Sequence, residues 1–154
     1  IRGLRYHGSG TATLQYGYNS CISNDHANVL NFLMSKYKSL LSKTKKVRKL
    51  YDEKLFKLGI SSVQTQSHTI SNNHKFVIKV QDRDNLKLYL ETKNIQSQIH
   101  YALPLSKMKM FYTDQQMPNA EKFSQDVLPL PIHPFLEDYE VARVCKCIGD
   151  FYGV

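Results

Sequence analysis

The chain has 154 residues and a formal net charge of +8, and 42% of its residues are hydrophobic and 22% charged. Its length suits one domain with a single core, or one domain and an arm, and its composition is that of an ordinary soluble globular protein. No apolar run approaches the roughly 20 residues that a membrane helix needs, so we expect no association with a membrane.

The start of the chain, IRGLRYHGSG, lacks both a Met and the pattern of a signal peptide, which indicates a fragment, a processed chain or an incomplete one. Its three cysteines, Cys21, Cys145 and Cys147, are an odd number and make no disulfide framework. The Cys-x-Cys pair also lacks the spacing of zinc ligands. We therefore expect a cytoplasmic protein without a metal site.

In chain order, residues 1–20 form an irregular arm rich in glycine and tyrosine. A long helix is expected next, because Ser23, Asn24 and Asp25 are candidate N-caps and apolar residues follow at helical spacing as far as Leu58. The pattern fits one very long helix, or two helices in line.

Nine Lys and Arg residues lie between positions 36 and 57 against two acidic ones, so this segment alone carries +7. Such a cluster is compatible with phosphate or nucleic-acid binding. However, it has no interleaved exposed aromatic residues, and a solvated lysine face on a helix is commonplace. We expect a solvated face and no specific nucleic-acid site.

The remaining segments predict a small α+β domain. Residues 61–74 are polar and turn-rich and indicate a loop. We expect strands over 75–80, 95–101 and 127–130, and helices over 82–93, from Pro118 and over 136–149. The strands should form one small, mainly antiparallel sheet with the helices 82–93 and 136–149 on one face. The three prolines in VLPLPIHPF suit an edge strand or a strand entering a turn.

No local motif for nucleophilic catalysis, phosphate binding or zinc hydrolysis is present. His100 is the most interesting histidine, because it ends an expected strand just before a loop bounded by a proline, where sites are often built. The alternative is a partly buried histidine bonded to the backbone. Tyr16 and Tyr18 flank Gly17 in a shaped loop, and their rings suit either stacking on a ligand or simple packing.

Five stretches share their order and spacing with segments of one family. IRGLRYHG matches lR-x-x-R-x-H-G, GYNS matches a G-x-N turn, and residues 24–58 match the helix pair that follows. QIHYALPLSKMKMF is similar to a strand and loop that reads I-H-Y-P-x-P-L-H, and the stretch from AEKF to CIGDF follows an ending with A-E and L-P-x-x-P. Together they resemble the DegT-type nucleotide-sugar aminotransferases, pyridoxal-phosphate (PLP) enzymes of fold type I.

The resemblance implies a trailing arm of a large PLP domain over residues 1–22 and a C-terminal small domain with long connecting helices over 23–154. It implies a homodimer in which Asn19, the Asn of the G-x-N turn, donates a hydrogen bond to the PLP phosphate of the neighbouring subunit. The alternative for this residue is a cap at the helix entry. Tyr18, His100 and Tyr101 are implied to line the side of the site that holds the nucleotide-sugar.

The family's PLP-binding lysine lies upstream of the segment at Ile1, and no lysine of this chain matches its surroundings. The resemblance therefore implies the C-terminal region of an aminotransferase that aminates a nucleotide-linked keto-sugar with an amino acid as donor, and that is inactive alone. Cys21, Ala102 and Ser106 stand where the family has Arg, Pro and His. These departures leave open a degenerate, non-catalytic relative that serves as a dimerisation or interaction domain.

Overall fold

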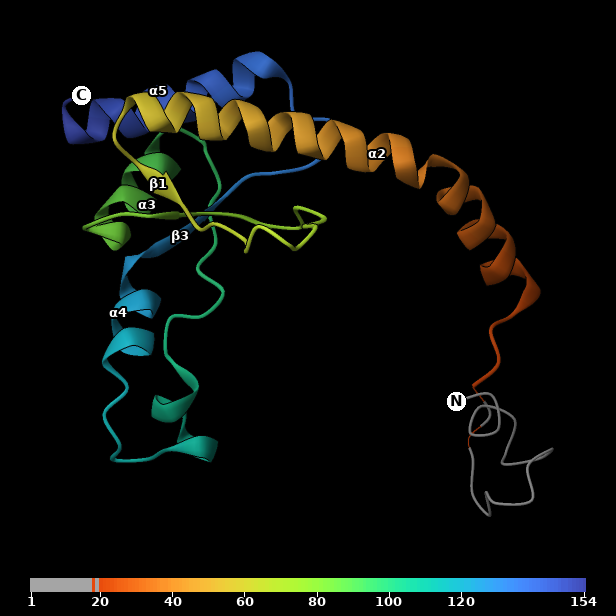
Figure 1. Ribbon diagram of the computed structural model, residues 1–154, viewed down its shortest axis with the longest axis horizontal. Coiled ribbons are helices and arrows are strands. Elements are labelled where there is room, and N and C mark those ends of the chain that lie inside the picture. The colour runs from red at the N-terminus through yellow and green to blue at the C-terminus, as the bar shows by residue number, and fades with distance from the viewer. Residues whose placement is uncertain (1–17, 19) are drawn as a thin grey trace. The chain divides into compact units, whose positions relative to one another are not determined.

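The computed structural model describes Tyr18 and residues 20–154 (Figure 1). The chain divides into two units, residues 1–38 and 39–154, with the boundary inside the long helix α2 (Asn24–Lys57). The sequence predicted either one very long helix or two helices in line, and the uninterrupted α2 confirms the single helix. The Ser23 hydroxyl accepts a hydrogen bond from the backbone N–H of His26 (3.3 Å), which identifies Ser23 as the N-cap. A boundary between residues 22 and 23 stays a prediction.

The second half of α2 belongs to the core of the second unit. Val47, Tyr51 and Leu55 are buried at a spacing of four residues, which places them on one face of the helix. In the first unit, by contrast, the apolar side chains of α2 are exposed. They are Val29, Leu30, Phe32, Leu33, Met34 and Tyr37.

The sheet has three antiparallel strands in the order β1-β2-β3. They are β1 (Ser61–Ser62), β2 (Phe76–Lys79) and β3 (Val127–Leu130). The predictions for 75–80 and 127–130 are confirmed, and β3 lies at an edge of the sheet, which is one of the two alternatives that the prolines of this stretch indicated. The short strand β1 lies in the segment that was expected to be a loop, so that prediction was wrong for Ser61 and Ser62.

The predicted strand over 95–101 was also wrong, because these residues form no strand. The reason lies in the free edge of β3. The N–H of Val80 donates to the carbonyl of Asp126 (2.8 Å), and bonded and non-bonded pairs alternate along an antiparallel ladder. Pro129, opposite Val77, is therefore in a non-bonded pair and turns its nitrogen toward the free edge. Proline has no N–H to donate there, so the edge cannot pair fully with another strand.

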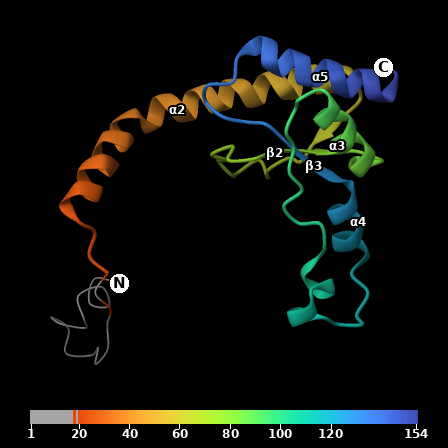
Figure 2. The ribbon, with the colours of Figure 1, turned by 180° about the vertical axis from the view of Figure 1, so that it is seen from behind.

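Two further helices complete the core. α3 (Arg83–Thr92) and α5 (Asp138–Tyr152) pack on each other, and α5 lies beside the second half of α2 in both views (Figure 1 and Figure 2). Buried side chains from these helices and the sheet form one cluster, which confirms that the helices cover one face. Its largest members are Tyr51, Leu55, Phe76, Ile78, Leu86, Leu90, Leu128, Val141 and Ile148.

The ends of α5 follow from local chemistry. Glu137 and Glu140 form a reciprocal capping box at its start. The helix continues through Gly149 to Tyr152, past the predicted end at residue 149, and stops at Gly153, whose φ of 72° is left-handed. α4 (Pro118–Asp126) begins at its proline as predicted and leads directly into β3.

Candidate functional site

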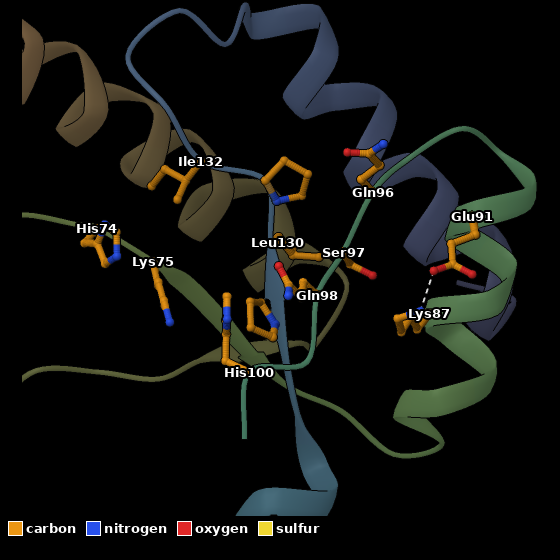
Figure 3. Close-up of a pocket in the computed structure, with 12 residues that line it drawn as sticks. His74, Lys75, Lys87, Glu91, Gln96, Ser97, Gln98, His100, Leu130 and Ile132 are labelled. Atoms are coloured by element: carbon orange, nitrogen blue, oxygen red, sulfur yellow. Dashed lines mark hydrogen bonds and ion pairs between the residues drawn. The ribbon is translucent and has the colours of Figure 1, made fainter. Parts of the chain in front are cut away.

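A polar pocket of about 660 Å³ lies at the free edge of β3 (Figure 3). Its walls are β3 and the residues after it, the non-strand segment 96–100, one side of α3 and the two residues before β2. The polar side chains that line it are His74, Lys75, Lys87, Glu91, Gln96, Ser97, Gln98 and His100. Because segment 96–100 does not pair with β3, the space between them stays open. A volume of this size is typical of small-molecule sites.

The two lysines of the polar pocket differ in their surroundings. Lys87 forms an ion pair with Glu91 one turn along α3, drawn as a dashed line in Figure 3. Lys75 has no such partner among the residues that the structure describes, and its ammonium group lies over the ring of Tyr101, 5.5 Å from the ring centre. A cation in this position is attracted by the π-electrons of the ring.

An apolar pocket of about 410 Å³ lies against the other face of the sheet. Its apolar lining comes from the outward-facing side chains of the sheet, from α4 and from the segment 99–105. These residues include Val77, Ile99, Leu103, Phe123 and Val127. Lys75, His100 and Pro129 line both pockets, so they form the boundary between a polar space and an apolar one.

The structure brings two of the sequence-predicted site residues together. The rings of His100 and Tyr101 are 6.5 Å apart, and Tyr101 is 69% exposed. His100 is exposed and makes no hydrogen bond within the described residues, so the alternative of a partly buried, backbone-bonded histidine was wrong. Tyr18, in the first unit, is 78% exposed. Asn19 lies outside the described residues.

Sequence reasoning missed Lys75 and Ser97. Lys75 directly precedes β2, and nothing in the alternation of KFVIKV indicates that this lysine lines a pocket. The hydroxyl of Ser97 is buried and has no hydrogen-bond partner among the described residues. Such a hydroxyl is uncommon, since most buried polar groups in folded proteins are paired.

The basic segment of α2 is mostly solvated, as expected. Lys46 pairs with Asp138 (3.2 Å) and Lys49 with Glu53 (3.7 Å), and all four side chains are more than half exposed. Arg48 and Lys54 are half-buried, and only 16% of the Arg48 side chain is exposed. The absence of a specific nucleic-acid site stays a prediction.

Arg48 instead connects α2 to the loop before β2. Its guanidinium group donates to the carboxylate of Asp52, the side-chain oxygen of Asn73 and the carbonyl of Val63. It also lies over the ring of Phe76, at 5.6 Å. Arg48 is therefore a structural residue and not a part of the solvated face.

The described residues do not fit a complete PLP site. Such a site uses a lysine that binds the cofactor and an acidic or basic partner for the pyridine nitrogen. Among the described residues no lysine is buried. Glu91 is the only carboxylate that lines either pocket, and it is paired with Lys87. Within the same part of the chain, no group of three or more His, Cys, Asp or Glu residues is arranged to hold a metal ion.

The buried thiol of Cys145 is not a candidate nucleophile. Burial raises the pKa of this thiol to about 11, and the opposing effect of Lys54 is smaller. The thiolate is the reactive form of cysteine, so Cys145 is protonated and unreactive near neutral pH.

The fold is a small α+β domain with a pocket at one edge of its sheet. Comparison with known proteins shows to which protein family the chain belongs. The sequence model of the DegT/DnrJ/EryC1/StrS aminotransferase family matches residues 1–149. The chain therefore belongs to this family, and the resemblance found in the sequence is confirmed. Sugar aminotransferases of this family depend on PLP in general.

Several relatives are similar over part or all of the chain. A dTDP-3-amino-3,6-dideoxy-alpha-D-galactopyranose transaminase of Aneurinibacillus thermoaerophilus is 36% identical over 80 residues, which are 51% of this chain and 22% of that protein. A UDP-N-acetyl-3-dehydro-alpha-D-glucosamine 3-aminotransferase of Acidithiobacillus ferrooxidans is 30% identical over 152 residues, which are 96% of this chain and 41% of that protein. The chain thus spans well under half the length of these relatives.

Solved structures show the same fold. The structure of S. venezuelae DesV in complex with a ketimine intermediate has a TM-score of 0.86 and 27% identity, and the match covers 97% of this chain and 42% of that one. A DegT DnrJ EryC1 StrS aminotransferase from Brucella abortus also has a TM-score of 0.86, at 24% identity, covering 99% of this chain and 43% of that one.

None of the helices in the described part of this chain is long and apolar enough to span a membrane.

Proposed function

We propose that this chain is the C-terminal part of a PLP-dependent aminotransferase that transfers an amino group from an amino acid to a nucleotide-linked keto-sugar. The observation that carries the proposal is the family match over residues 1–149, together with a small-domain fold that aligns with two fifths of longer aminotransferases. The two relatives described above are named for dTDP-linked and UDP-linked amino-sugar chemistry, which supports a nucleotide-sugar substrate.

In this proposal the reaction centre is shared with a part of the protein outside this chain. Bound PLP supplies the electron sink for amino-group transfer, and the lysine that binds it lies outside residues 1–154. Asn19 donates a side-chain N–H to the PLP phosphate of the opposite subunit, so the active unit is a homodimer. The lack of a buried lysine among the described residues supports this division of roles.

Tyr18, His100 and Tyr101 line the side of the site that holds the nucleotide-sugar. The exposed imidazole of His100 offers a hydrogen-bonding group at the boundary between the polar and apolar pockets. The exposed ring of Tyr101 offers an apolar face with a polar tip, which suits a sugar or a nucleobase.

A non-catalytic dimerisation or interaction domain is the second candidate. It is compatible with a run of exposed large apolar side chains between residues 101 and 112, since such surfaces mark interaction sites. They are Tyr101, Leu103, Leu105, Met108, Met110, Phe111 and Tyr112. This surface suits either candidate, because an enzyme assembled from two domains and two subunits also needs it covered.

The deciding experiment compares the complete protein that contains this chain with the 154-residue chain alone. Each is incubated with PLP, amino acid donors and UDP-linked or dTDP-linked keto-sugars, and amino-sugar formation is measured by mass spectrometry. We expect activity only from the complete protein. We also expect borohydride reduction with PLP to label no single lysine of the 154-residue chain stoichiometrically. A complete protein that binds no PLP and transfers no amino group would favour the interaction domain.

A further inference from the structure

Lys75 occupies the boundary between the polar and the apolar pocket. It directly precedes β2, its side chain is half-buried, and it lines both spaces together with His100. In Figure 3 Lys75 and His74 lie at one side of the polar pocket, the ion pair of Lys87 and Glu91 lies at the opposite side, and His100 lies between them in this view.

This arrangement leaves the two ends of the polar pocket with different charges. Glu91 neutralises Lys87, and no other carboxylate lines the polar pocket. No carboxylate lines the apolar pocket either. The ammonium group of Lys75 has a contact with the ring of Tyr101 and no ion pair among the described residues. The end of the pocket at Lys75 therefore carries an uncompensated positive charge.

The rest of the polar pocket offers uncharged hydrogen-bonding groups. Gln96 and Gln98 contribute side-chain amides, and His74 and His100 contribute imidazoles. The buried hydroxyl of Ser97 lacks a partner within the described chain. A pocket with a cation at one end and several neutral donors and acceptors beyond it suits a ligand that combines an anionic group with hydroxyl groups.

We propose that Lys75 forms an anion subsite that selects for substrates with a phosphate or carboxylate group at this end of the pocket. The inference rests on the proposed function, because it assumes that the ligand is a nucleotide-sugar. Within that class the anionic group has two sources, the diphosphate of the nucleotide and a carboxylate on the sugar. Lys75 is a binding and specificity residue and takes no part in the chemical step.

Lys79, the last residue of β2, provides a matched control four positions after Lys75. Its ammonium group lies over the ring of Phe123 at 5.8 Å, much as that of Lys75 lies over Tyr101 at 5.5 Å. Lys79 lines neither of the two pockets. The two lysines thus share a cation–π contact and differ in access to the proposed ligand.

The experiment measures binding to the complete protein by isothermal titration calorimetry, which requires no turnover. The ligands are UDP, UDP-glucose and UDP-glucuronate, and the proteins are unmodified, Lys75→Met, Lys75→Arg and Lys79→Met. We expect Lys75→Met to weaken binding about tenfold or more, since a charge-assisted hydrogen bond is lost. Lys75→Arg should retain most of the affinity, and Lys79→Met should stay within about twofold of the unmodified protein.

The ligands separate the two sources of charge. If Lys75 binds the diphosphate, Lys75→Met weakens all three ligands equally, and if it binds the sugar carboxylate, only UDP-glucuronate is weakened. Equal affinities of Lys75→Met and the unmodified protein for every ligand, with unchanged thermal unfolding, would overturn the inference. An equal loss in Lys79→Met would also overturn it. A complete protein that binds these ligands through Lys75 but transfers no amino group would contradict the proposed reaction and leave the subsite intact.

Discussion

The rings of Tyr51 and Phe76 stack with their centres 4.8 Å apart and their planes 17° from parallel. Both side chains are fully buried, and the contact joins the second half of α2 to the central strand β2. Phe76 directly follows Lys75 in the chain. The stack therefore holds β2 against α2 and so helps to position Lys75 at the pocket. The hydroxyl of Tyr51 is buried without a hydrogen-bond partner among the described residues.

Removing this hydroxyl should stabilise the domain. We expect Tyr51→Phe to raise the free energy of unfolding by about 1 kcal/mol, because it keeps the stacked ring and removes an unpaired buried polar group. Tyr51→Ala should lower it by about 3–5 kcal/mol, since it leaves a cavity in the core. Urea unfolding of the three proteins measures both changes. A Tyr51→Phe variant less stable than the unmodified chain would show that the hydroxyl has a partner, such as a bound water.

The buried thiol of Cys145 should make stability depend on alkaline pH. Its pKa is raised from an ordinary value of 9.0 to about 11 by burial. The folded state therefore holds this proton more tightly than the unfolded state does. The resulting stabilisation is fully present below about pH 9 and is lost as the pH rises toward 11.

Cys145→Ala removes this titration. We expect its unfolding free energy to fall less steeply between pH 9 and pH 11 than that of the unmodified chain, measured by chemical denaturation in a reducing buffer. Parallel slopes for the two proteins would contradict the assignment.

Arg48 should contribute more to stability than the lysines around it. Arg48→Met leaves the side-chain oxygen of Asn73 and the carbonyl of Val63 without this donor. We expect a loss of about 2 kcal/mol in the free energy of unfolding, because hydrogen bonds to a charged group are involved. Lys49→Met, at the next position, should change stability by no more than about 0.5 kcal/mol, since its ion pair with Glu53 is exposed. Similar losses in both variants would show that Arg48 has no special structural role.

Sequence patterns predicted the elements that local chemistry determines. The capped long helix, the strands at 75–80 and 127–130 and the amphipathic helices all have a periodicity that depends on burial of one face. The two-residue strand β1 has no periodicity to detect. The strand predicted over 95–101 failed because its formation depends on the edge that it would join, and Pro129 withholds a donor from that edge.

The candidate site was predictable only in part. His100 was predicted because it precedes a proline-bounded loop, and Tyr101 because of the family motif; both line a pocket, and their roles stay predictions. Lys75 and Ser97 were not predicted as site residues. They line the pocket only because the space between β3 and the segment 96–100 is open. That space is a property of the tertiary structure, and no local spacing in the sequence encodes it.

The most direct test of the account is PLP retention by the Asn19→Ala variant of the complete protein. Loss of one hydrogen bond to the charged phosphate should weaken PLP binding by roughly ten- to a hundredfold. The unfolding temperature should stay unchanged, and Ser20→Ala, at the next position, should show a smaller effect on PLP. Cofactor occupancy is measured by absorbance after dialysis. An Asn19→Ala protein that retained full PLP occupancy and unfolded at a lower temperature would show that Asn19 has a structural role and would contradict its proposed role in the neighbouring subunit.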